Sequence, residues 1–182
     1  MANKDVYAQE DALVIAEVLK GRKTSFTILV NRYQRLVRIT IWNYFRKREF
    51  VDDLCQEALL KAYLNLSALR EPAKFKNWLL QVTFRLCVDY QRRNRVENSC
   101  VESLGENDGI LFAVNNEESF ILDEASVLSL LNRLSSVDCF VVWLRYVEEL
   151  SYDSIASIID STETAVRQKA SRAMKSMRKY LK

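Results

Sequence analysis

The sequence predicts an all-α protein in which two small helical domains are joined by a flexible acidic linker, with a helix-turn-helix in the C-terminal domain. One proline and three glycines occur among the 182 residues, as expected of a largely helical chain. Apolar residues recur at steps of three and four in both halves. Between Val96 and Asn132, by contrast, eight acidic residues occur and no lysine or arginine. These patterns predict domains at residues 1–95 and 125–182 and a linker at residues 96–124.

Four helices are predicted in the N-terminal domain. The first spans residues 11–20 and ends at Gly21, and Thr24 is expected to cap the second. The third opens at Asp52, and the fourth spans about residues 74–95. Core positions expected in the last two helices are Leu54, Ala58, Ala62, Leu66, Phe75, Trp78, Leu79, Val82 and Leu86.

The C-terminal domain has the pattern of a helix-turn-helix. Ser151 and Thr162 are expected to be the N-caps of two short helices, and Asp160 lies at the turn, where it tolerates a left-handed conformation. From Thr164 to the end there are seven basic residues and no acidic one, which suits a helix that neutralises phosphates. The expected buried positions are Ile155, Ala156, Ile159, Val166, Ala170, Ala173, Met174 and Met177. Two amphipathic helices alone fit a surface hairpin with a solvated basic face equally well, and the turn chemistry and one-sided charge favour DNA binding.

The composition excludes several classes of protein. The chain has no histidine, and its four cysteines are isolated (Cys55, Cys87, Cys100 and Cys139), so we expect no metal site, no cofactor and no enzyme. Three of these cysteines lie in apolar helical patterns, which favours buried reduced thiols over a redox switch. No apolar run reaches membrane-spanning length and the first residues do not form a signal peptide, so we expect no membrane insertion and a cytoplasmic location.

Three blocks carry a resemblance to the extracytoplasmic-function (ECF) subfamily of bacterial RNA polymerase sigma factors. They are DDLCQEALLKAYLNL, FKNWLLQVTFRLCVDYQRRNR and ELSYDSIASIIDSTETAVRQKASRAM. Their order and spacing are more specific than the helix-turn-helix alone. The resemblance implies an alternative sigma factor, which binds core RNA polymerase and directs promoter-specific transcription initiation without catalysing a reaction or taking a small-molecule substrate. It also implies an anti-sigma factor as a partner, and apolar clusters in the linker, at residues 101–104 and 110–114, agree with a segment that docks.

The resemblance implies three sets of site residues. In the family, the acidic helix binds the clamp helices of the largest polymerase subunit. The next helix and the loop before it recognise and melt the minus-ten element, and the second helix of the helix-turn-helix reads the minus-thirty-five element. The residues so implied are Asp53, Gln56 and Glu57 for polymerase, Lys74, Asn77, Arg85, Arg92 and Arg93 for the minus-ten element, and Thr164, Arg167, Gln168, Ser171 and Arg172 for the minus-thirty-five element.

Three positions depart from the common family pattern. Arg85 stands where many members have Asn, Asp160 where Gly is frequent at the turn, and Ala165 where Thr is frequent. The substitution at Arg85 leaves the minus-ten preference open.

A rival interpretation comes from another class of protein. A stand-alone helix-turn-helix regulator would use its N-terminal domain for dimerisation or sensing. It would bind a palindromic duplex tightly without polymerase, whereas a sigma factor would bind weakly alone and specifically with polymerase.

Overall fold

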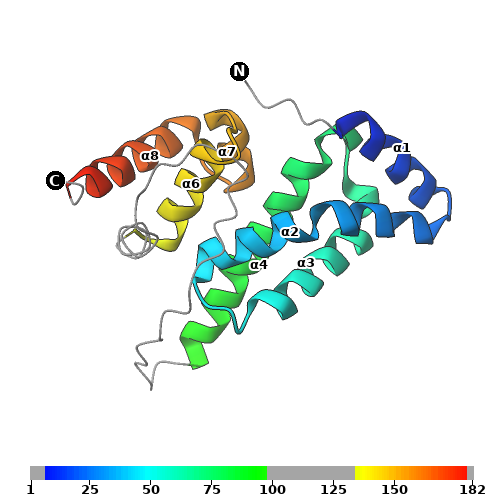
Figure 1. The fold of residues 1–182 in the computed structure, drawn as a ribbon, viewed down its shortest axis with the longest axis horizontal. Coiled ribbons are helices and arrows are strands. Elements are labelled where there is room, and N and C mark those ends of the chain that lie inside the picture. The colour runs from blue at the N-terminus through cyan, green and yellow to red at the C-terminus, as the bar shows by residue number, and fades with distance from the viewer. Residues whose placement is uncertain (1–6, 98–133, 180–182) are drawn as a thin grey trace, which may run out of the picture.

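The computed structural model describes residues 7–97 and 134–179 (Figure 1). Within these two ranges the secondary structure consists of α-helices and short 3-10 turns, so the prediction of an all-α fold is confirmed. The helices are α1 (Ala8–Leu19), α2 (Phe26–Phe45), α3 (Val51–Leu64), α4 (Phe75–Glu97), α6 (Ser136–Tyr146), α7 (Tyr152–Ile158) and α8 (Glu163–Arg178). The 3-10 turns span Lys23–Ser25, Leu66–Ala68 and Pro72–Lys74. None of the helices in these ranges is long and apolar enough to cross a membrane.

The N-terminal body, residues 7–97, has the four helices that the sequence predicts. Helices α2, α3 and α4 pack on one another, and α1 lies across one end of them (Figure 1). Asp11 on α1 is fully buried and accepts hydrogen bonds from Arg32 and Tyr33 on α2, which ties the two helices together. Most of the predicted core positions are buried, and Trp78 and Val82 are partly buried.

The beginnings of two helices differ from the expectation. Thr24 does not cap α2, because it lies inside a 3-10 turn and α2 begins at Phe26 without a side-chain cap. The hydroxyl of the neighbouring Ser25 instead donates to Glu17, at 2.9 Å, and so holds the turn against α1. Helix α3 begins at Val51, one residue before the expected Asp52, and the carboxylate of Asp52 pairs with Arg38 of α2 at 2.5 Å.

The C-terminal body, residues 134–179, contains α6 followed by the helix-turn-helix of α7 and α8. Ser151 and Thr162 are confirmed as N-caps, since their hydroxyls accept the backbone N–H of Ser154 and Ala165, each at 3.2 Å. Asp160 has a φ of 51°, which confirms the left-handed conformation expected at the turn. All the predicted apolar positions of α7 and α8 are buried or partly buried.

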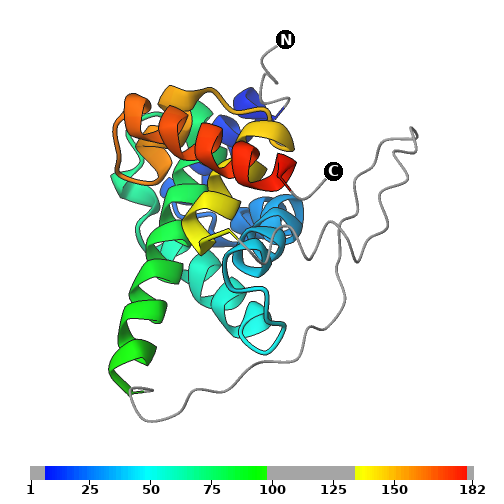
Figure 2. The ribbon, with the colours of Figure 1, turned by 90° about the vertical axis from the view of Figure 1, so that its left-hand side faces the viewer.

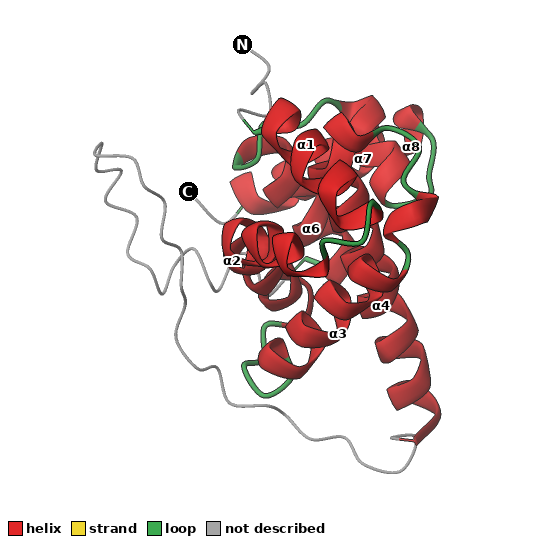
Figure 3. Ribbon diagram, turned by 90° about the vertical axis from the view of Figure 1, so that its right-hand side faces the viewer, coloured by secondary structure: helices red, strands yellow, loops and turns green. Residues whose placement is uncertain are grey.

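The two bodies pack directly against each other. Helix α6 lies on α2, and α7 lies on α4 (Figures 2 and 3). The rings of Phe84 on α4 and Phe140 on α6 are nearly parallel, at 12°, with their centroids 5.1 Å apart. Leu80, Phe84 and Cys87 are therefore buried as well as the predicted stripe, and one set of buried side chains runs through both bodies. The predicted linker, residues 96–124, lies outside the described residues except for the end of α4.

Candidate nucleic-acid interface

The exposed side of α8 brings together four of the five residues implied for minus-thirty-five reading. Residues three and four apart on a helix share a face, so their side chains surround a single shallow depression, here called the α8 hollow. The hollow has a volume of about 400 Å³ and is lined by Arg167, Gln168, Ser171 and Arg172. Thr164 is exposed in the first turn of α8 but does not line the hollow.

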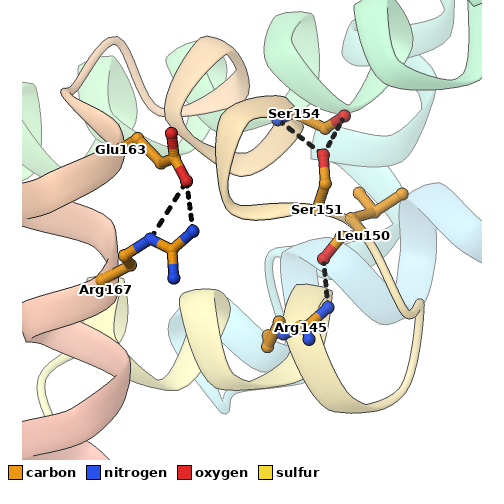
Figure 4. Close-up of polar contacts among 6 residues, drawn as sticks. All are labelled: Arg145, Leu150, Ser151, Ser154, Glu163 and Arg167. Carbon is orange, nitrogen blue, oxygen red and sulfur yellow. Dashed lines mark hydrogen bonds and ion pairs between the residues drawn. The ribbon is translucent and has the colours of Figure 1, made fainter. Parts of the chain in front are cut away.

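The two arginines of the hollow are held differently. Arg167 donates from Nε and Nη2 to one carboxylate oxygen of Glu163, at 3.0 and 2.6 Å (Figure 4). Arg172 has only a long hydrogen bond, 3.4 Å from its Nε to the carbonyl of Gln168. Arg167 would therefore have to leave a carboxylate to bind another anion, whereas Arg172 would give up only its long hydrogen bond. Arginine in such a position makes bidentate contacts to guanine, and glutamine to adenine.

Tyr152 was missed by the sequence analysis and contacts arginines of both α6 and α8. Its ring lies 4.7 Å from the guanidinium of Arg167 and 4.8 Å from that of Arg145 on α6. Arg145 also donates to the carbonyl of Leu150, at 3.0 Å (Figure 4). The aromatic residue next to the Ser151 cap is the local signal that could have found this contact. Tyr152 thus links α6 to Arg167, in the second turn of α8, and orients the hollow.

A second depression, the α4–α7 groove, lies between the two bodies. It has a volume of about 720 Å³ and contains three of the five residues implied for minus-ten binding. One wall carries Lys74, Asn77, Gln81 and Arg85, and the other carries Asp153, Ser157 and Ile158 of α7. Trp78 lines the groove while it also packs on the core, so its ring serves both surfaces. Arg92 and Arg93 are exposed farther along α4 and do not line the groove.

Arg85 is bound to the opposite wall of this groove. Its Nε and Nη2 donate to the two carboxylate oxygens of Asp160, at 2.9 and 3.0 Å. Gln81, one turn earlier, donates to the carbonyl of Ser157 at 2.8 Å and to Asp160 at 3.3 Å. The hydrogen bond from Arg85 lowers the pKa of Asp160 below its ordinary value, so this carboxylate is ionised at neutral pH. Lys74 pairs with Glu71 in the preceding loop, at 2.8 Å.

The residues implied for polymerase binding lie on the exposed side of α3. Asp53 and Gln56 are exposed, and Glu57 pairs with Lys61 one turn on, at 2.9 Å. Two leucines that the sequence analysis missed extend this side of the helix: Leu60 is 56% exposed and Leu64 is 66% exposed. Their spacing of four from Gln56 and from each other was the available signal. We call Asp53, Gln56, Glu57, Leu60 and Leu64 the α3 stripe.

The cysteines of the described residues are structural. Cys55, Cys87 and Cys139 are buried and unpaired, as the apolar patterns predict, and Cys100 lies outside the described residues. Burial raises the pKa of all three thiols, that of Cys87 to about 12. A neutral thiol is a poor nucleophile and a poor metal ligand, so the burial agrees with a packing role.

Comparison with known proteins agrees with this arrangement. Residues 29–97 match the model of Sigma-70 region 2, and residues 124–177 match that of Sigma-70, region 4. The chain is 29% identical over 172 residues to the ECF RNA polymerase sigma-E factor of Escherichia coli, with 90% of each chain covered. The same factor of Haemophilus influenzae is 28% identical, again over 90% of each chain.

Two solved structures share the fold. One is the sigma factor RpoE in complex with the anti-sigma factor NepR from Bartonella quintana, with a TM-score of 0.72 at 19% identity over 86% of this chain and 96% of that one. The other is CnrH in complex with the cytosolic domain of CnrY, with a TM-score of 0.67 at 20% identity over 94% and 96%. The two matched regions occur in order, one in each body, and the sigma-E similarity spans both. This chain therefore belongs to the ECF group of the sigma-70 factors.

Proposed function

We propose that this chain binds core RNA polymerase in the cytoplasm and directs it, as an alternative sigma factor, to promoters that it reads at two elements. The observation that carries the proposal is that the chain presents the acidic and apolar α3 stripe as well as the basic α8 hollow. A protein that only occupied an operator would need the hollow but not the stripe. A factor that positions polymerase needs both.

The α3 stripe is the proposed polymerase contact. It combines two carboxylates with Leu60 and Leu64, and exposed leucines next to charge are typical of a surface that a partner covers. A helical partner with basic and apolar side chains is complementary to such a surface. Asp53 and Gln56 would form the polar contacts, and the leucines would supply the buried area.

The α4 side of the groove is the proposed minus-ten site. A base must leave the stack before its Watson–Crick edge can be recognised, and the loop at residues 68–74 would receive it. Lys74, Asn77 and Arg85 would then hold the strand next to the groove, with Arg92 and Arg93 farther along the same helix. Positive side chains that follow a strand contribute affinity with little sequence preference.

The α8 hollow is the proposed minus-thirty-five site, with Arg167, Gln168, Ser171 and Arg172 towards the bases and Thr164 at the edge of the contact. Each bidentate contact discriminates against the wrong base by about 1–3 kcal/mol. Lys169, Lys175, Arg178 and Lys179 are proposed as phosphate contacts or solvated charge.

An anti-sigma factor is the proposed regulator. Support comes from the similar fold of RpoE, which was solved in complex with the anti-sigma factor NepR. A partner that binds this chain would keep it from polymerase until a signal releases it. A pull-down of this chain from cells should recover such a partner. Recovery of the chain with polymerase alone, and never with an inhibitory partner, would contradict this part of the proposal.

Reconstituted transcription tests the main proposal. Purified protein is added to core RNA polymerase with a promoter library, and the transcripts are sequenced. We expect initiation from a defined promoter set with shared elements at both positions. Initiation no more specific than that of core polymerase alone would overturn the proposal. Tight binding to a palindromic duplex without polymerase would instead support the stand-alone regulator.

A further inference from the structure

The row of side chains on α4 that faces DNA in the proposed function also faces α7. Asn77, Gln81 and Arg85 are four residues apart, so they form one line along the helix. All three line the α4–α7 groove, whose other wall belongs to the helix-turn-helix. Gln81 and Arg85 both bond to that wall, and each of them reaches Asp160. The C-terminal body therefore lies over the row that the promoter strand would use.

The contact between Arg85 and Asp160 has the geometry of an arginine bound to a phosphate. Two parallel hydrogen bonds, of 2.9 and 3.0 Å, join the guanidinium to two oxygens of one anion. Arginine binds carboxylates and phosphates in the same forked manner, so the two anions compete for one guanidinium. Asp160 reaches this position from the turn of the helix-turn-helix, where its backbone is left-handed.

This pair differs from the other contacts between the bodies. The side chains of Arg85 and Asp160 remain 58% and 54% exposed, so solvent and DNA reach them. Lys76 and Glu148, which also join the two bodies, at 2.9 Å, are each only 17% exposed. Phe84 and Phe140 are buried. The Arg85–Asp160 pair, together with the neighbouring contacts of Gln81, is thus an inter-body contact that an incoming strand meets at the surface.

We propose that Asp160 takes the place of a promoter phosphate on Arg85, so that the factor alone keeps its minus-ten site closed with its own helix-turn-helix. This inference rests on the proposed function, because it regulates the same site. Single-stranded DNA and Asp160 cannot bind Arg85 at the same time, so DNA must displace the carboxylate. The α8 hollow stays exposed in the closed arrangement, so the closure affects the minus-ten site selectively.

The test removes the carboxylate without changing the turn. Asp160→Asn keeps a residue type that tolerates the left-handed backbone, and it leaves Arg85 in place. The matched control is Asp153→Asn, which removes the same charge from the same groove wall but leaves the Arg85–Asp160 pair intact. The two measurements are amide hydrogen exchange in α7 and binding to a mixed-sequence DNA single strand of about 12 nucleotides.

We expect Asp160→Asn to increase exchange in α7 and to tighten strand binding about 1.5- to 5-fold, the range of an exposed ion pair. Asp153→Asn removes a first-turn charge of α7 but leaves the pair intact, so it should change exchange and binding less than Asp160→Asn does. In an Arg85→Gln background, which weakens strand binding by itself, Asp160→Asn should change binding no more than Asp153→Asn does.

Several outcomes would overturn the proposal that Asp160 closes the minus-ten site. Equal gains in Asp160→Asn and Asp153→Asn would mean that bulk charge alone is responsible. A gain in the Arg85→Gln background that is larger than the gain of Asp153→Asn would contradict the proposal, and so would unchanged exchange and binding in Asp160→Asn. The transcription assay with the wild type is separate: its failure would overturn the proposed function, whereas the exchange and strand-binding measurements need no polymerase.

Discussion

Arg85 and Asp160 form a bidentate ion pair although 75 positions separate them in the sequence. Each residue by itself departs from the family pattern that the resemblance implies, Arg85 on α4 and Asp160 at the turn of the helix-turn-helix. In the folded chain the two departures meet and complement each other in charge. The pair therefore gives each of these two residues a partner in this chain.

Salt should loosen the closed arrangement through this pair. Both side chains are more than half exposed, and raising the salt from about 0.1 M to about 1 M shortens the screening length from about 10 Å to about 3 Å. We expect amide exchange in α7 to rise about two- to fivefold over this range in the wild type and in Asp153→Asn. Asp160→Asn should respond less. An equal salt response in all three proteins would contradict this assignment.

Arg172→Ala should lower initiation on promoters that depend on the upstream element by about 5- to 150-fold, the equivalent of one lost bidentate contact. Arg172 makes only one long hydrogen bond in the factor itself, so its loss should not destabilise the fold. Run-off transcription on paired promoters, with and without that element, measures the effect. Lys175→Ala removes the same charge from the same helix and should cause a smaller loss that is similar on promoters with and without the upstream element.

Asp53→Ala should weaken binding to core polymerase about tenfold, because it removes a charged hydrogen-bonding group from the α3 stripe. Initiation should therefore fall on all promoters alike. Leu60→Ala should weaken polymerase binding too, without loss of stability, since Leu60 is 56% exposed. Competition with a labelled sigma factor for core polymerase measures both. Glu10→Ala, on α1, is the control and should bind normally, because Glu10 is 64% exposed and its partner Arg32 keeps its contact with Asp11. Normal binding by both stripe variants would exclude the stripe as the contact.

Local features were predictable from the sequence, and the reason is physical. Ser151 and Thr162 act on backbone groups three residues away, and the left-handed turn at Asp160 depends on one residue's own backbone. Such short-range interactions depend only on residues that are close together in the sequence. Thr24 was predicted wrongly because the start of α2 is set instead by a contact between Ser25 and Glu17, a residue of another helix.

Long-range packing was not predictable in this way. The periodicity of α4 predicts one buried stripe, yet Leu80 and Phe84 are also buried because the C-terminal body covers a second side of the helix. The α8 residues implied by the resemblance do share a face, whereas the minus-ten residues are divided between the groove and the exposed end of α4. The partner of Arg85 lies in a different body, and no local pattern of residues identifies it.

Phe140→Ala should lower the free energy of unfolding by about 3–5 kcal/mol, as usual for the loss of a fully buried aromatic ring. Phe140 is 0% exposed and stacks on Phe84 of the other body, so the loss should also loosen the contact between the bodies. Urea unfolding followed by circular dichroism measures the first effect. Tyr146→Ala, on the same helix, removes a ring that is 51% exposed and should cost much less. Equal losses from the two variants would contradict the packing described for α6.

The thiol of Cys87 should react only slowly with alkylating reagents in the folded protein at pH 8. Burial raises its pKa to about 12 from the ordinary 9.0, so the thiol stays neutral and the reactive thiolate is scarce. Alkylation by iodoacetamide, followed peptide by peptide with mass spectrometry, should be slow in buffer and fast in denaturant. Equal rates in the two conditions would contradict its burial.

The same shift in pKa makes stability depend on pH in a defined direction. A thiol whose pKa is higher in the folded protein contributes stability that is fully present below pH 9 and is lost as the pH rises toward 12. Cys87→Ala removes this contribution, so the wild type should lose more stability than the variant between these two pH values. Urea unfolding at a series of pH values measures the difference. Parallel curves for the two proteins would mean that Cys87 ionises as freely in the folded state as in the unfolded one.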